Sequence, residues 1–263
     1  MPIKLSVSAI VLALALSSPA LAEERDFCAN RPGLDTPACT LAPGDAMIEV
    51  GLLGWSHQGD AAGRDDTLTL GDTTLRLGLT PRSEIDLGFT SYVRDRTRDA
   101  SGVSSSASTG DATIAFRRGL AGPNGPIALQ AYVSLPVGKS PGGAGDWGAG
   151  MLVPMGFNLG HGFQFTLTPE ADAAVNASGS GRHFAFGSAA GISHGLGKAL
   201  SLTVEASVFR DLDPSGHDTQ AMVAESLAWQ AGKRFQLDIE ADERLAGGVP
   251  DHSLMVGLAR RFR

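Results

Sequence analysis

The 263-residue sequence has few aromatic residues (6%), few charged residues (19%) and no sustained helical periodicity after residue 44. Its mean hydropathy is close to zero (+0.02), so a bundle of membrane-spanning helices is not expected. Acidic residues outnumber basic ones by 28 to 21, which argues against a nucleic-acid partner. The length allows one or two domains.

The N-terminus has the pattern of a secretory signal peptide. Lys4 precedes an apolar run at residues 5–16, and Ala20-Leu21-Ala22 forms a small-x-small cleavage site. An uncleaved membrane anchor is the alternative, but this apolar run is short for a bilayer span. We therefore expect residues 1–22 to be removed and the mature chain to begin near Glu23 in an exported protein.

The sequence has only two cysteines, Cys28 and Cys39, and both follow the predicted cleavage site closely. In an oxidising compartment this pair predicts one disulfide. Two free thiols or half of a metal site are the alternatives, but no histidine lies nearby in the sequence. We expect residues 23–44 to form a short periplasmic segment that the disulfide ties down ahead of a barrel at residues 45–263.

Alternation of apolar and polar residues replaces helical periodicity after residue 44. We predict twelve strands, at residues 46–57, 67–80, 84–94, 111–118, 127–137, 147–159, 163–172, 183–193, 200–210, 219–229, 235–243 and 252–262. The sixth and tenth alternate too poorly for their facing to be predicted. The connections alternate between mostly short turns and longer polar loops, among which residues 95–110 are expected to form an external loop. An even number of strands with this alternation is typical of a transmembrane antiparallel up-and-down β-barrel.

The lengths of the predicted strands favour a membrane over a soluble core. Many have about ten residues, which suits a tilted bilayer span, whereas ordinary strands average about five or six. A sheet in hydrocarbon must close, because its edge N–H and C=O groups would otherwise lack partners. The last strand ends with Phe262, an aromatic that resembles the assembly signal of outer-membrane barrels, although Arg263 follows it. A secreted β-sandwich and an eight-stranded lipid-binding barrel are the soluble alternatives.

The apolar residues are therefore predicted to face lipid, and the polar residues between them to face the lumen. The predicted lumen-lining residues carry charges of both signs: Glu49, Arg76, Glu84, Asp86, Arg94, Asp111, Arg117, Glu170, Asp172, Glu205, Asp238 and Glu240. Around the turn at 81–83, Arg76 and Asp86 are predicted to be cross-strand or diagonal neighbours. Such charges either constrict an open pore or satisfy one another and close the lumen. Carboxylates at 170, 172, 238, 240 and 242 predict a mild cation preference if the pore is open.

Several segments resemble the outer-membrane transporter-like proteins grouped as the "MetA-pathway of phenol degradation" family. They are FCANRPGLDTPACTLAPGDAMIEVGLLGW, TLRLGLTPRSEIDLGFTSY, GDATIAFRRGL, Leu135-Pro136-Val137-Gly138, GAGDWGAGMLVP and LTPEADAAVN. The resemblance covers essentially the whole mature chain. It implies an outer-membrane barrel with a channel or transporter role, named for an association with the catabolism of aromatic compounds. It implies no catalytic residues.

The sequence contains no convincing catalytic or metal-binding motif. The six histidines lie near strand ends or in loops without close metal-ligand spacing, and no G-x-S-x-G nucleophile elbow stands out. The loop at residues 211–218 has three aspartates but departs from the calcium-binding pattern. We expect no cofactor, no metal and no enzymatic activity.

The predicted protein is a monomeric barrel in the outer membrane of a Gram-negative bacterium, inserted into outer-membrane lipid by the barrel assembly machinery. It passes small molecules, with aromatic or hydrophobic solutes as candidates, through a charge-lined lumen or by lateral exit. A non-conducting structural or surface-interaction barrel is the second hypothesis, and an outer-membrane enzyme is the third.

Overall fold

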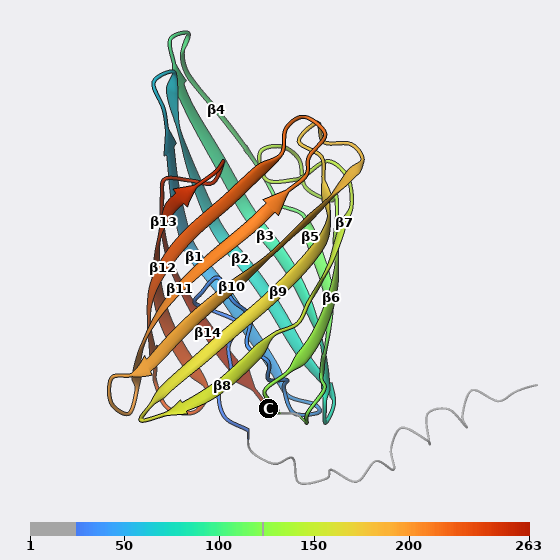
Figure 1. Cartoon of the computed structure of the whole chain (residues 1–263), viewed down its shortest axis with the longest axis vertical. Coiled ribbons are helices and arrows are strands. Elements are labelled where there is room, and N and C mark those ends of the chain that lie inside the picture. The colour runs from blue at the N-terminus through green and yellow to red at the C-terminus, as the bar shows by residue number, and fades with distance from the viewer. Residues whose placement is uncertain (1–24, 123) are drawn as a thin grey trace, which may run out of the picture.

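The computed structural model describes residues 25–122 and 124–263, which form a closed antiparallel β-barrel of twelve strands (Figure 1). The predicted signal peptide at residues 1–22 lies outside the described residues. Two of the twelve strands are interrupted, so fourteen segments carry labels: β1 (Ala46–Gly59), β2 (Gly63–Thr80), β3 (Ser83–Asp99), β4 (Gly102–Ser108), β5 (Ala112–Gly119), β6 (Ala128–Leu135), β7 (Gly148–Leu152), β8 (Met155–Gly160), β9 (Phe163–Val175), β10 (Arg182–Gly195), β11 (Leu200–Asp211), β12 (Asp218–Gln230), β13 (Phe235–Ala246) and β14 (His252–Phe262). The barrel closes because β1 pairs with both β2 and β14. Within the described ranges, no helix is long and apolar enough to cross a membrane.

The burial pattern confirms the predicted facing of the sheet. Arg76, Glu84 and Arg117 have no exposed surface, whereas Phe89 and Phe116 are 41% and 46% exposed. A soluble sheet would show the opposite pattern, with charges outside and large apolar side chains in the core. The barrel is therefore polar inside and apolar outside, as a lipid environment requires.

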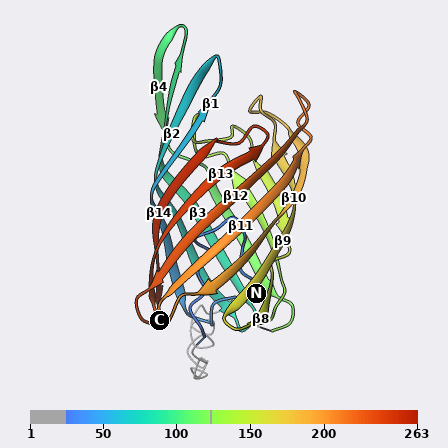
Figure 2. The same cartoon turned by 60° about the vertical axis from the view of Figure 1, so that its left-hand side comes forward.

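The fourth strand consists of β4 and β5, which both pair with β3 on the same side. β4 falls within the predicted external loop at residues 95–110, so most of that region is a β-hairpin with the end of β3. The hairpins β1–β2 and β3–β4 project beyond the barrel rim (Figures 1 and 2). With 18 residues, β2 reaches about 60 Å at 3.3 Å per residue, well beyond the 9–11 residues that cross a bilayer.

The sixth strand is interrupted between β7 and β8 by Val153 and Pro154. Pro154 has no N–H to donate, but its carbonyl oxygen accepts a bond from the Ala128 amide at 2.9 Å. The Val153 amide bonds to the Pro169 carbonyl at 3.0 Å. This break explains why alternation along residues 147–159 gave no clear facing.

The predicted inward position of Arg94 is wrong. Arg94 is exposed, and its Nε donates to Ser105 Oγ at 2.9 Å on the projecting hairpin. Thr90 and Val93 line the same cavity although they are three residues apart, so the alternation along β3 reverses between them. Across the hairpin at this level stands Gly71 on β2, with a φ of +64° that favours glycine. A reversal of this kind is not visible in apolar periodicity.

Candidate functional site: a chain segment inside the barrel

Residues 25–44, here called the inner segment, lie inside the barrel (Figures 1 and 2). We predicted a short, disulfide-tied periplasmic segment ahead of the barrel, and the described part of this segment is bonded to inward-facing side chains far along the sequence. Arg31 Nη2 lies 3.0 Å from Asp238 Oδ1 on β13, and the Thr36 amide donates to Thr168 Oγ1 on β9 at 3.2 Å. The segment thus crosses the lumen and contacts opposite walls.

Inward carboxylates hold the inner segment by accepting hydrogen bonds from its backbone. The segment has no strand partner, so its buried amides need other acceptors. Four predicted lumen residues supply them, in these pairs: Glu49 with the Asn30 amide (3.0 Å), Glu84 with Leu41 (2.6 Å), Glu205 with Leu34 and Asp35 (3.2 and 3.0 Å), and Glu240 with Gly33 (2.7 Å). These carboxylates serve as structural anchors for the segment.

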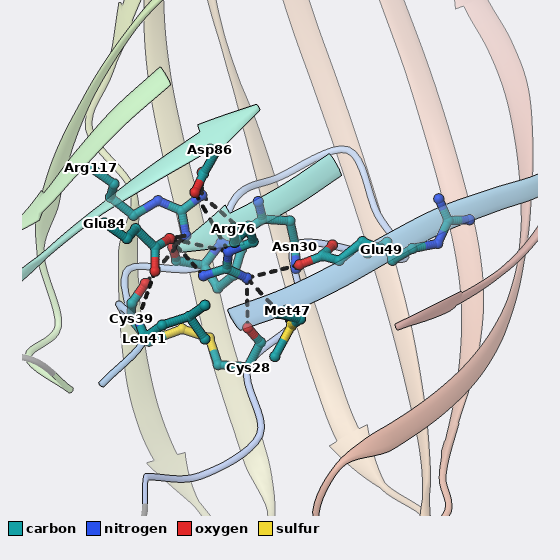
Figure 3. A network of polar contacts seen from close by, with 12 residues as sticks. Cys28, Asn30, Cys39, Leu41, Met47, Glu49, Arg76, Glu84, Asp86 and Arg117 are labelled. Atoms are coloured by element: carbon teal, nitrogen blue, oxygen red, sulfur yellow. Dashed lines mark hydrogen bonds and ion pairs between the residues drawn. A yellow bond between two sulfur atoms is a disulfide. The ribbon is translucent and has the colours of Figure 1, made fainter. Parts of the chain in front are cut away.

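Two arginines with no exposed surface bind the carbonyl side of the inner segment (Figure 3). Arg76 Nη1 donates to the Cys28 carbonyl at 2.7 Å and to Glu49 at 2.9 Å, and its Nη2 lies 2.7 Å from Glu84. Arg117 Nη1 donates to the Cys39 carbonyl at 3.2 Å and lies 3.3 Å from Glu84. The two cations and the surrounding carboxylates form one desolvated network, in which loss of a partner leaves a buried charge uncompensated.

The hairpin prediction is confirmed in its register, since Arg76 pairs directly with Asp86 across β2 and β3. The nearer partners of Arg76 are Glu49 and Glu84, because its Nε remains 3.9 Å from Asp86 Oδ1. Arg117 Nη2 lies 3.6 Å from Asp86 Oδ2. Asp86 therefore completes the network around both arginines.

The predicted disulfide between Cys28 and Cys39 is present and lies within this network. It joins the two residues whose carbonyl oxygens face Arg76 and Arg117. The disulfide thus fixes the separation of two acceptors that bind two different strands, β2 and β5.

Further arginine contacts join the start of the inner segment to β14 and to the turn between β2 and β3. Arg261 Nη1 donates to the carbonyl oxygens of Arg25 and Asp26 at 2.7 and 3.2 Å. Arg25 Nη2 in turn donates to the Pro81 carbonyl at 2.8 Å, in the turn between β2 and β3. Phe262, the predicted assembly signal, is 44% exposed at the end of β14, and its role in assembly stays a prediction.

Three predicted lumen residues have other partners. Tyr132 on β6 donates to Asp172 at 2.7 Å and lies 3.3 Å from Glu170, so these two carboxylates share one hydroxyl. Asp111 accepts from the amides of Gly138 and Ala144 at 2.9 and 2.8 Å, and thereby holds a rim loop.

The loop at residues 211–218 is a hydrogen-bonded turn. The Ser215 hydroxyl, with the amides of Ala177 and Ser215, lowers the pKa of Asp213 to about 2. His183, near the start of β10, lies with its Nε2 2.8 Å from Asp211 and its Nδ1 3.3 Å from Asp213. In the described part of the chain, no group of three or more candidate ligands could hold a metal ion.

Free space remains in the lumen beside the inner segment. One cavity of about 390 Å³ is bounded by Arg31 and by Pro250, which lies in the loop after β13. A second, of about 240 Å³, lies beside Asn30 and Asp86, and both cavities contact Asp72 and Thr90. The site is therefore a narrow, partly filled lumen with small chambers.

Sequence reasoning missed the residues of the inner segment that fill the lumen, above all Asn30 and Arg31. It also missed Tyr132, whose hydroxyl donates to Asp172 at 2.7 Å. The available signal was the excess of inward charges that no predicted cross-strand neighbour could neutralise.

Comparisons with known proteins agree with this architecture. A family model described as "Putative MetA-pathway of phenol degradation" matches residues 29–262. An outer-membrane channel from Pseudomonas putida F1 is 15% identical, with a TM-score of 0.70 over 88% of this chain and 99% of that chain. The β domain of the Bordetella autotransporter BrkA is 13% identical, with a TM-score of 0.58 over 84% and 100%. The sequence matches no curated protein. At these identities the solved structures establish the outer-membrane barrel fold alone.

Proposed function

The chain belongs to the MetA-pathway phenol-degradation family, and from this premise we propose that it is a passive outer-membrane channel for small solutes and not an enzyme. The observation that carries the proposal is a closed barrel whose lumen is narrowed by its own N-terminal segment. The chambers of about 390 and 240 Å³ fit small molecules, since ligand sites usually measure about 300–1,000 Å³.

A polar solute would leave the chambers past the inner segment. The segment is held by several hydrogen bonds and ion pairs, so a small shift of residues 30–36 would break more than one of them together. Such a shift would widen the passage between the segment and the barrel wall. Carboxylates remain in excess around it, at Glu205, Asp238, Glu240 and Asp242. This excess supports a mild cation preference for ions that pass.

An apolar solute has a second route through the barrel wall beside the interrupted sixth strand. A depression of about 570 Å³ lies there, floored by small residues such as Ala131, Gly150 and Ala171, and it reaches Tyr132 and Asp172. The pairing is short, because β7 pairs with β9 over only four residue pairs. Lateral exit at this point would deliver an apolar solute to the membrane without crossing the inner segment.

A non-conducting barrel is the second candidate function, and the filled lumen favours it. The buried arginine network would then act only as a structural core, and the projecting hairpins β1–β2 and β3–β4 would contact other molecules. Measurement of transport separates the two candidates directly.

The test is solute flux in proteoliposomes together with conductance in planar bilayers. The wild-type protein should pass phenol and show small conductance steps. Arg31→Ala, which removes the 3.0 Å ion pair with Asp238, should increase conductance because one anchor of the inner segment is lost. Arg94→Ala is the matched control, since Arg94 is exposed outside the lumen. Absence of both flux and conductance in all three proteins would favour the non-conducting barrel.

The proposal includes the route of the protein to the membrane. Residues 1–22 act as the export signal, the mature chain begins near Glu23, and residues 45–263 insert as a monomer through the barrel assembly machinery. Migration that changes on heating, with a single folded species in cross-linking, is the expected result.

A further inference from the structure

The larger lumen cavity is lined by Arg31 of the inner segment, by Pro250 and by residues of β1, β2, β3, β12, β13 and β14. Val93 of β3, Met222 of β12 and Met255 of β14 give it an apolar surface, and each is partly buried. Methionine side chains are flexible and polarisable, so two of them adapt to planar apolar molecules.

The only cationic side chain that lines this cavity among the described residues is already neutralised. Arg31 Nη2 lies 3.0 Å from Asp238, and its Nε donates to the same carboxylate at 3.0 Å. Its guanidinium lies flat against Gly257, where a Cβ atom would collide with it. Arg31 is therefore held in place at the edge of the cavity, and its charge is neutralised by Asp238, so it does not attract an anionic solute.

Apart from the hydroxyls of Ser56, Thr69, Thr90 and Ser253, the remaining polar side chains of the cavity are carboxylates, which only accept hydrogen bonds when ionised. Asp72 is exposed and accepts one bond, from Thr90 Oγ1 at 2.8 Å. Asp242 also lines the cavity, and its Oδ1 is buried without a hydrogen-bond partner among the described residues. Two carboxylates against an apolar wall favour a solute that donates a hydrogen bond and disfavour one that is negatively charged.

We propose that this cavity is a binding site for a small solute with an apolar body and one hydrogen-bond donor, a hydroxyl or an amine. The inference rests on the proposed channel function and names the class of solute that the channel takes up. The solute places its apolar body against Met222 and Met255 and donates to the Asp72 or Asp242 carboxylate.

The test measures binding of three probes to the detergent-solubilised full-length mature protein by titration calorimetry. Phenol should bind about tenfold or more tightly than toluene, which lacks the donor, because a hydrogen bond to a charged group is a strong one. Benzoate should bind at least tenfold more weakly than phenol. Equal binding of phenol and toluene, or preference for benzoate, would overturn the proposal.

Variants test whether this cavity is the site. Met222→Trp should lower phenol affinity at least tenfold by filling the cavity, and Val93→Phe is a second filling variant. Val204→Trp, on a 49% exposed lipid-facing position, is the matched control and should leave binding unchanged. The double variant Asp72→Asn, Asp242→Asn should reduce the preference for phenol over toluene to less than threefold. Phenol binding that survives both filling variants in heat-modifiable, folded protein would refute the assignment.

Flux measurements on the same variants separate this inference from the proposed channel function. Phenol flux that does not saturate and does not respond to Met222→Trp would refute the binding site while leaving the channel. Binding that follows the predicted order in a protein without flux would support the site and refute the channel.

Discussion

Replacement of Arg76 by alanine should destabilise the barrel more than almost any other single change. The Arg76 guanidinium has no exposed surface and lies within 2.9 Å of Glu49, 2.7 Å of Glu84 and 2.7 Å of the Cys28 carbonyl. Removing one partner of a buried ion pair costs about 3–5 kcal/mol, because the remaining charge is left in a desolvated site. An exposed ion pair contributes only about 0–1 kcal/mol.

The free energy of unfolding can be measured for Arg76→Ala in lipid vesicles by urea titration with tryptophan fluorescence. We expect a loss of about 3–5 kcal/mol, against about 0.5 kcal/mol or less for Arg94→Ala on the exposed hairpin. Neutralising a remaining partner, in Arg76→Ala with Glu49→Gln, should recover part of the loss. The reasoning is refuted if Arg76→Ala costs no more than Arg94→Ala, or if the second substitution adds its own full penalty.

Three further predictions follow from other parts of the molecule. Leu87→Arg, on the lipid-facing side of β3, should cost about 2–4 kcal/mol if it lies near the midplane, whereas Leu87→Ile should fold with normal yield in vesicles. Replacing Cys28 and Cys39 by serine should free the two carbonyls that bind Arg76 and Arg117, and so produce more frequent or larger conductance steps; traces identical to wild type would show that the disulfide does not hold the segment. The lowered pKa of Asp213 adds stability to its loop above the ordinary carboxylate pKa, and that stability is lost as the pH falls through about 2. Hydrogen exchange at the Ala177 amide should therefore stay slow at pH 4 and become fast near pH 2, whereas Asp213→Asn should weaken the protection already at pH 4.

The strands and their facing could be predicted because lipid imposes one strict alternation on them. The pair Arg76 and Asp86 followed from a short turn and a fixed register. The outward position of Arg94 could not be predicted, because the inward and outward alternation along β3 reverses opposite Gly71. Such a reversal leaves no mark in the pattern of apolar and polar residues. The sixth strand was ambiguous for a similar reason, since Pro154 interrupts its ladder.

The position of the inner segment could not be predicted from periodicity, because its twenty residues have no regular secondary structure. Its place depends on contacts with residues up to 236 positions away, such as that between Arg25 and Arg261. The lumen charges were identified correctly as inward-facing, but their partners were not. Glu205 and Glu240 bind backbone amides that no cross-strand rule includes.

The contacts of the inner segment also constrain the order in which the molecule can be completed. Arg31 and Arg25 leave the ribosome early, yet their partners Asp238 and Arg261 belong to the last two strands. The segment must remain without these partners while most of the chain is synthesised and exported. Its contacts with Asp238 and Arg261 can form only after these two strands have taken their places, of which β14 pairs with β1 to close the barrel. The first segment of the mature chain is thus among the last to acquire its full set of partners.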